Sequence, residues 1–125
     1  MYWIETTLTN EELANITPPS EYTKGLIPIK ELVNRNFEYQ PLIDSEGWRV
    51  VYNGIRTDIR NRIQQHLRSK GNGTGRLGLN AYPELRTKNW RVSYYFLTPE
   101  EYKIYSILFE KGWRGFYGCP ILCRN

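Results

Sequence analysis

The chain has 125 residues, with 17 Lys and Arg against 13 Asp and Glu, and a net charge of +4. This length fits a single domain with its own core, and a hydrophobic fraction of 40% is ordinary for a globular protein. One histidine and two cysteines argue against a structural zinc site, and we interpret Cys119 and Cys123 as reduced thiols. The sequence shows no signal peptide and no membrane-length apolar run. We therefore expect a soluble, intracellular protein of the cytoplasm.

The first third of the chain gives weak signals. Residues 1–8 alternate weakly and could form a short strand. Thr9 can cap a short helix whose first turn is acidic. Residues 17–25 contain two prolines and a glycine and indicate a loop, and residues 27–33 fit either a helical turn or an extended segment. We expect residues 1–36 to form an N-terminal extension consisting of a short helix and a loop.

A second part, residues 37–125, is expected to form the main domain. Residues 37–43 are predicted to be a strand, in which Pro41 removes one hydrogen-bond donor and favours an edge or a bulge. Residues 44–47, DSEG, are typical of a turn. Residues 48–54 are rich in β-branched and aromatic side chains and predict a second strand. The two strands would form an antiparallel hairpin.

A basic helix follows the hairpin. Thr57 or Asp58 can cap it, and the residues expected to form its buried stripe are Ile59, Ile63 and Leu67, with Gly71 as a stop. Residues 71–85 are rich in glycine and are expected to form a mobile loop. Residues 89–97 predict a third strand. Thr98 and Pro99 begin a second helix that runs to about Lys111. The predicted architecture is an α+β fold, a small three-stranded antiparallel sheet flanked by helices.

Positive charge is concentrated around the basic helix. Residues 1–22 contain four acidic residues and no basic one, whereas residues 56–76 contain six basic residues and one acid. Such a segment attracts phosphate groups, although a solvated helix face would have the same composition. The candidate nucleic-acid-binding residues are Arg56, Arg60, Arg68, Lys70 and Arg76.

Arg62 and His66 are four residues apart and therefore lie on one face of this helix. Tyr52 lies on the strand that leads into the helix, and Gly54 permits a close turn there. Hydrolysis of a phosphodiester needs a cation for the phosphate, a base for water, a metal ion and a carboxylate that holds the metal. Arg62 supplies the cation, His66 or a tyrosine could supply the base, and Glu110 or Glu101 the carboxylate.

Three segments carry a resemblance to a known family. They are FEY at residues 37–39, YNG at 52–54 and IRTDIRNRIQQHL at 55–67. Together they resemble the GIY-YIG nuclease domain, over roughly residues 37–125. The strongest part is the Tyr-x-Gly pattern at 52–54, followed by Arg62 eight residues after Gly54 and by His66. In the first motif only Tyr39 is retained, and Asn53 replaces an aliphatic residue in the second.

The resemblance implies a role for each matching residue. Tyr39 and Tyr52 would activate or orient the attacking water, and Arg62 would contact the scissile phosphate. His66 would act as a general base or a phosphate ligand. Glu110 is the preferred metal ligand and Glu101 its rival. Gly54 and Asn125 would support the site.

The resemblance also implies a function. We expect a stand-alone endonuclease of the restriction or phage type that cleaves nucleic acid, preferably double-stranded DNA, with a single Mg²⁺ or Mn²⁺ ion. A homodimer is possible, because such enzymes often cut both strands as dimers. Two alternatives remain: a catalytically inactive nucleic-acid-binding module on the same fold, and a protein-interaction or inhibitor protein that uses the acidic N-terminus as its contact surface.

Overall fold

The fold is built around a three-stranded antiparallel sheet. The computed structural model describes residues 1–20, 24–38, 43–68 and 75–123. Strands β1 (Tyr2–Thr6), β2 (Arg49–Gly54) and β3 (Trp90–Tyr94) are arranged in the order β2-β1-β3. The helices are α1 (Asn10–Ala14), α2 (Ile29–Arg35), α3 (Ile59–Leu67), α4 (Pro83–Arg86) and α5 (Pro99–Tyr117), with a 3₁₀ turn, η1, at Leu79–Ala81. The predicted α+β class, a small antiparallel sheet flanked by helices, is confirmed.

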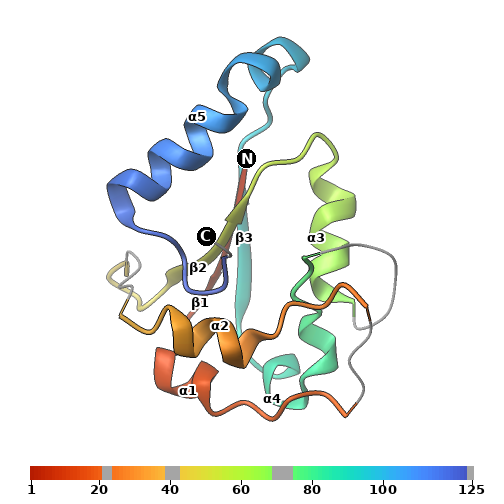
Figure 1. The fold of residues 1–125 in the computed structure, drawn as a ribbon, viewed down its shortest axis with the longest axis vertical. Coiled ribbons are helices and arrows are strands. Elements are labelled where there is room, and N and C mark those ends of the chain that lie inside the picture. Colours follow the sequence, from red (N-terminus) through yellow and green to blue (C-terminus); the bar gives the residue numbers. More distant parts are fainter. Residues whose placement is uncertain (21–23, 39–42, 69–74, 124–125) are drawn as a thin grey trace.

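The helices surround the sheet unevenly. Figure 1 shows α3 on one side of the sheet and α5 on the other, with α1, α2 and α4 at the end where β1 finishes. Most of the core lies with α1 to α4, where Ile4, Leu13 and Val33 are buried. Within the described parts of the chain, no helix is both long enough and apolar enough to cross a membrane.

The central strand of the sheet comes from the N-terminus, which the predicted hairpin of residues 37–54 did not anticipate. β1 pairs with both β2 and β3, whereas residues 37–38 form a turn, Ile43 makes one isolated bridge to Arg49, and residues 39–42 lie outside the described residues. Almost every residue of β1 is buried, on both faces of the strand, so its sequence lacks a clear alternation of apolar and polar residues. Residues 1–36 thus contribute the middle of the sheet and are more than an appended helix and loop.

The local signals of the N-terminal helices are confirmed. The Thr9 hydroxyl accepts a hydrogen bond from the Glu12 backbone, and the Glu12 carboxylate accepts one from the Thr9 backbone, which is a capping box. Residues 27–33, for which the sequence left two possibilities, fall mostly in α2. At the end of α2, the Asn36 side chain donates to the carbonyl oxygens of Ile121 and Cys123 at 3.0 and 3.2 Å. These two hydrogen bonds join the C-terminal segment to the core.

The expected mobile loop is wrong over residues 75–85. This stretch forms η1 and most of α4 and buries Leu77, Leu79, Tyr82 and Leu85. These apolar residues are spaced two or three apart between polar ones, so no helical or strand period is visible in the sequence. Residues 71–74, with the expected stop at Gly71, lie outside the described residues.

The buried face of α3 also differs from the prediction. Ile59 is buried and Ile63 partly buried as expected, but Leu67 is exposed. Arg62 and His66 are buried in its place. Polar side chains can occupy a core when they form hydrogen bonds there, and a hydrophobicity pattern does not register such residues.

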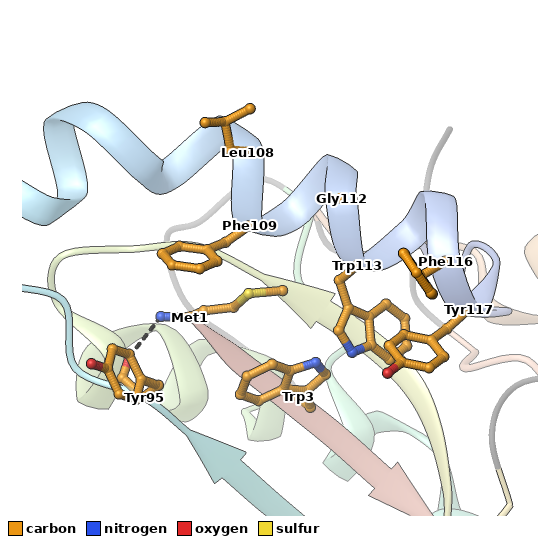
Figure 2. Close-up of a pocket in the computed structure, with 9 residues that line it drawn as sticks. All are labelled: Met1, Trp3, Tyr95, Leu108, Phe109, Gly112, Trp113, Phe116 and Tyr117. Atoms are coloured by element: carbon orange, nitrogen blue, oxygen red, sulfur yellow. Dashed lines mark hydrogen bonds between the residues drawn. The ribbon is translucent and has the colours of Figure 1, made fainter.

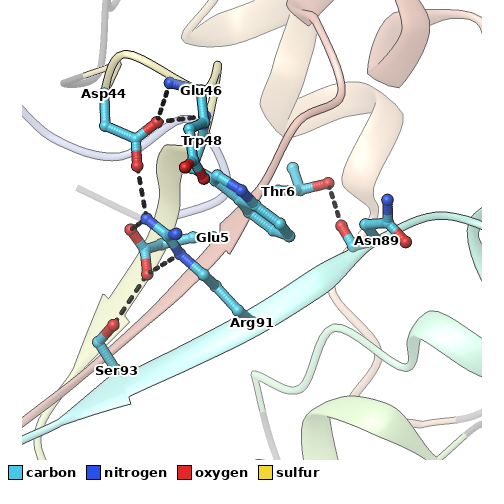
Figure 3. A network of polar contacts seen from close by, with 8 residues as sticks. All are labelled: Glu5, Thr6, Asp44, Glu46, Trp48, Asn89, Arg91 and Ser93. Atoms are coloured by element: carbon cyan, nitrogen blue, oxygen red, sulfur yellow. Dashed lines mark hydrogen bonds and ion pairs between the residues drawn. The ribbon is translucent and has the colours of Figure 1, made fainter.

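A polar network holds the face of the sheet that carries Glu5 and Arg91, as Figure 3 shows. The Arg91 guanidinium donates to Glu5 at 3.0 Å and to Asp44 at 2.8 Å, and it lies 4.5 Å from the centre of the Trp48 ring. Asp44 also accepts hydrogen bonds from the backbone of Glu46 and Trp48, as the predicted turn at residues 44–47 requires. This network ties the turn before β2 to β1 and β3.

The Asn36 contact gives a test of the fold. We expect Asn36→Ala to lower the free energy of unfolding by about 1–3 kcal/mol, because two buried carbonyls lose their donor. Asn34→Ala, on an exposed position of the same helix, should change it by less than about 0.5 kcal/mol. Urea denaturation of both variants measures the difference, and equal effects would contradict this role.

Candidate active site

Three aromatic side chains are grouped around the end of β2, and one of them, Tyr2, was not anticipated. The Tyr2 hydroxyl lies 3.0 Å from Nε2 of His66. The Tyr52 ring lies 4.6 Å from the His66 ring and 6.2 Å from the Tyr2 ring, between centroids. Tyr2 comes from β1, Tyr52 from β2 and His66 from α3, so this cluster joins three elements.

The hydrogen bonds of His66 fix its tautomer. Nδ1 of His66 accepts a hydrogen bond of 3.1 Å from the backbone N–H of Leu77, so the proton of the neutral ring lies on Nε2. Nε2 then donates to the Tyr2 hydroxyl. Burial, reinforced by the charges of Arg62 and Arg56, lowers the pKa of His66 to about 3. The neutral ring is therefore a buried structural donor, and no part of its surface is exposed.

The structure explains why the Tyr-x-Gly pattern at residues 52–54 ends in a glycine. A Cβ at this position would lie 2.6 Å from the Tyr2 hydroxyl oxygen, well inside van der Waals contact. The bare backbone of Gly54 leaves room for Tyr2 to reach His66. Burial raises the pKa of the Tyr2 hydroxyl far above its usual range, with Tyr52 adding to the effect and Arg62 opposing it. Tyr2 therefore keeps its proton near neutral pH.

Arg62 is held in a defined position at the edge of this cluster. Its guanidinium donates to Oε1 of Gln65 at 2.9 Å and to the carbonyl of Gly75 at 2.8 Å. It also forms hydrogen bonds with Tyr2 and Tyr52. Arg62 is buried over most of its surface, and its guanidinium is therefore held in place before any ligand arrives.

A polar cavity of about 290 Å³ lies between β2, α3 and α5. The Glu110 carboxylate faces it from α5 and forms an ion pair of 2.9 Å with Arg114. Arg114 in turn donates to Oδ1 of Asn53 at 3.0 Å, which ties α5 to β2. The lining residues are Ile27, Tyr52, Arg56, Arg62, Gly75, Glu110, Arg114 and Cys123.

The other predicted site residues differ in whether they line this cavity, are exposed or are buried. Glu101 does not line this cavity, whereas Glu110 does. Arg60 and Arg68 are exposed on α3 and can meet a ligand. Arg76 is 1% exposed and donates to the carbonyl of Arg68. Its prediction as a nucleic-acid-binding residue is therefore wrong, because its charge is used inside the fold. Tyr39, Lys70 and Asn125 lie outside the described residues.

Sequence reasoning missed Tyr2 and Arg114. Tyr2 could have been found from the aromatic and apolar run at residues 1–4, had this run been taken as a strand covered on both faces. Arg114 follows Glu110 by four residues, the spacing of an ion pair on one helix face. This signal was available in the sequence.

Comparison with known protein families points to the same part of the chain. The model of the GIY-YIG catalytic domain family matches residues 42–118, more than half of the chain and the part that holds Tyr52, Arg62, His66 and Glu110. The chain therefore belongs to the GIY-YIG catalytic domain family, a family of nucleases. No curated protein and no solved structure matches the chain significantly.

The buried state of His66 gives a pH prediction. Its pKa is about 3 in the folded chain and 6.5 ordinarily, so the unfolded chain takes up this proton first as the pH falls. The contribution of the neutral His66 ring to the free energy of unfolding is complete above pH 6.5 and is lost as the pH drops from 6.5 toward 3. We expect the free energy of unfolding to fall by up to about 1.4 kcal/mol per pH unit in this window.

Nuclear magnetic resonance checks the cause directly, because the chain contains one histidine. The ring protons of His66 in the folded protein should not titrate until the pH approaches 3. A midpoint near 6.5 would mean that the ring is solvated and that the tautomer assignment is incorrect.

Proposed function

We propose that this protein is a metal-dependent endonuclease that hydrolyses phosphodiester bonds, preferably in double-stranded DNA, with a single metal ion. The observation that supports this most strongly is the composition of the cavity of about 290 Å³. One carboxylate, Glu110, faces three arginines and Tyr52 there. Phosphate needs cations, and a metal needs an anionic ligand, so this composition suits both at once.

The arginines are assigned to the phosphate. Arg62 is fixed by Gln65 and Gly75 and would stabilise the negative charge that develops on the pentavalent phosphorus. Arg56 is exposed at the mouth of the cavity and would hold a flanking phosphate. The exposed Arg60 and Arg68 extend the basic surface along α3 and would follow the nucleic-acid backbone.

The residues present fit a divalent oxygen-binding metal such as Mg²⁺ or Mn²⁺. Mg²⁺ is commonly bound by one or two carboxylates and keeps several waters, and Glu110 offers one carboxylate in a solvent-accessible cavity. Among the described residues, no group of three or more His, Cys, Asp or Glu side chains could hold a metal by itself. When bound, the metal would counter the charge on the leaving oxygen.

The tyrosines and His66 are assigned separate roles. Tyr52 lines the cavity, so its hydroxyl would orient the attacking water. Tyr2 is 1% exposed and touches His66 and Arg62. We therefore assign Tyr2 and His66 as positioning residues that fix Tyr52 and Arg62, and we replace the general-base role expected for His66 because its ring is fully enclosed.

Cleavage of supercoiled plasmid tests the function. We expect the wild-type protein to cut with Mg²⁺ and to be inactive with EDTA. Arg62→Ala and Glu110→Gln should each lower the rate by about a hundredfold or more, because each removes charge stabilisation in the transition state. Glu101→Gln is the matched control for the rival carboxylate and should stay within about threefold of wild type.

The result can exclude either part of the proposal. If Glu101→Gln abolishes cutting and Glu110→Gln does not, the metal ligand is assigned incorrectly. If the folded wild-type protein binds DNA in a salt-dependent manner but never cuts, the fold serves as a binding module and the catalytic proposal fails.

The assignment of Tyr2 as a positioning residue, in contrast to Tyr39, gives a separate prediction. Tyr2→Phe should lower kcat by about tenfold with little change in KM, because Tyr52 and Arg62 lose a positioning contact without loss of substrate contacts. Tyr39→Phe, at the tyrosine that the sequence motif suggested, should change kcat by less than about twofold. A larger loss in Tyr39→Phe would restore Tyr39 as the first-motif tyrosine.

A further inference from the structure

The two cysteines of the chain lie next to each other after α5. Both are free thiols, with Cys119 partly exposed and Cys123 only 1% exposed. The backbone N–H of Cys123 donates to the carbonyl of Pro120 at 2.9 Å, and this turn brings the two side chains together. The Cys123 thiol forms a hydrogen bond with the Cys119 sulfur. The two side chains are therefore directed at each other, as a disulfide between them would require.

The surroundings make the two thiols chemically unequal. The hydrogen bond from Cys123 lowers the pKa of Cys119 to about 7, with help from the charge of Arg114 and against the effect of burial. Burial, reinforced by the hydrogen bond with Cys119, raises the pKa of the Cys123 thiol. Peroxides react with the thiolate form of an accessible cysteine. Cys119 is therefore the more reactive of the two, and Cys123 is its buried neighbour.

Cys123 also holds a residue of β2. Its Sγ accepts a hydrogen bond of 3.4 Å from the backbone N–H of Asn53 and lies 3.5 Å from Oδ1 of the same residue. The Asn53 side chain is buried, and its Nδ2 has no hydrogen-bond partner among the described residues. The orientation of this amide thus depends on the contacts of Oδ1, which are those with Cys123 and Arg114.

Asn53 in turn anchors the part of α5 that carries Glu110. Arg114 donates to Oδ1 of Asn53 at 3.0 Å and forms the ion pair of 2.9 Å with Glu110. Next to this link, an apolar cavity of about 620 Å³ lies between α5 and the sheet, with Trp113 and Trp3 among its lining residues (Figure 2). A cavity provides few packing contacts, so the position of Glu110 relies on the polar link through Asn53.

We propose that Cys119 and Cys123 are a peroxide-sensitive modification site, and that a disulfide between them weakens the link from Asn53 to Arg114. The Cys119 thiolate attacks one oxygen of hydrogen peroxide and becomes a sulfenic acid, while the O–O bond breaks and the hydroxide that leaves takes up a proton to form water. The Cys123 sulfur then attacks the Cys119 sulfur. The S–S bond forms as the S–O bond breaks, and the thiol proton leaves with the hydroxide as a second water.

The disulfide changes what Cys123 offers to Asn53. It removes the thiol proton and draws the sulfur toward Cys119, so the contacts with the backbone N–H and with Oδ1 of Asn53 are weakened. Arg114 is then held by an amide that has lost its second support, and Glu110 is held less firmly through Arg114. The expected effect on cutting rests on the proposed nuclease function, whereas the formation of the disulfide does not.

Mass spectrometry tests the formation of the disulfide. Tryptic peptide 115–124 contains both cysteines, and after treatment of the folded protein with hydrogen peroxide it should have lost the mass of the two thiol hydrogens. Dithiothreitol should restore the thiols. Cys123→Ser should instead leave a sulfenic acid at Cys119 that dimedone traps. A wild-type protein that keeps both thiols, oxidises only to sulfinic acid or forms a disulfide between two chains overturns the proposal.

Plasmid cleavage tests the link to the site. The disulfide form should cut about tenfold or more slowly than the reduced protein, because Glu110 loses a fixed partner, and dithiothreitol should restore the rate. Cys119→Ser is the matched control, because residue 119 does not line the cavity of Glu110. This variant should cut like the reduced wild type with and without peroxide. Equal rates for the two wild-type forms, or the same loss in Cys119→Ser, overturn the link.

Nuclear magnetic resonance separates this proposal from the nuclease function. The backbone amide signal of Asn53 should shift when the disulfide forms, because its acceptor is Sγ of Cys123. The signal should not shift when Cys119→Ser is treated with peroxide. If the reduced wild type never cuts DNA, the nuclease function fails while the shift still supports the link. An Asn53 signal that is the same in the reduced and disulfide forms overturns the link.

Discussion

The hydrogen bond between the Tyr2 hydroxyl and Nε2 of His66 is the constraint on which the candidate site depends. His66 can make this bond because Leu77 occupies its other ring nitrogen, and Tyr2 can reach it because Gly54 has no side chain. The central strand, α3 and the segment after residue 75 are joined in this way. Arg62, one helical turn before His66, is then held at the edge of the cavity without needing a substrate to order it.

The two halves of the site are supported very differently. The half on β2 and α3 belongs to the core, where Arg62 and His66 are buried. The half on α5 belongs to a helix with no buried residue, which is anchored near the site by the contact of Arg114 with Asn53. Cys123 also contacts Asn53, so the C-terminal segment supports the same point from the core side.

Much of the fold could be predicted where the signal was local. The Thr9 capping box, the Asp44 turn and the start of α5 at Thr98 each depend on hydrogen bonds within four residues, and all three are found. β1 was harder to predict because its pairing is long-range and because almost all of its residues are buried, which removes the alternating pattern. The burial of Arg62 and His66 was not predictable from hydrophobicity, because it depends on partners at Tyr2, Gly75 and Leu77. Tyr2 was therefore overlooked as a member of this cluster, and Tyr39, at which the tyrosine of the first motif was sought, lies outside the described residues.

We propose that one carboxylate of α5 and the arginines around it form a single metal and phosphate site. Mn²⁺ titration of isotope-labelled protein tests this most directly, since the paramagnetic ion broadens signals close to where it binds. We expect broadening centred on Glu110 and Tyr52, and we expect it to be lost in Glu110→Gln with the remaining spectrum unchanged. Broadening centred on Glu101 or on the Glu5 and Asp44 network, or the same broadening in Glu110→Gln, would contradict it.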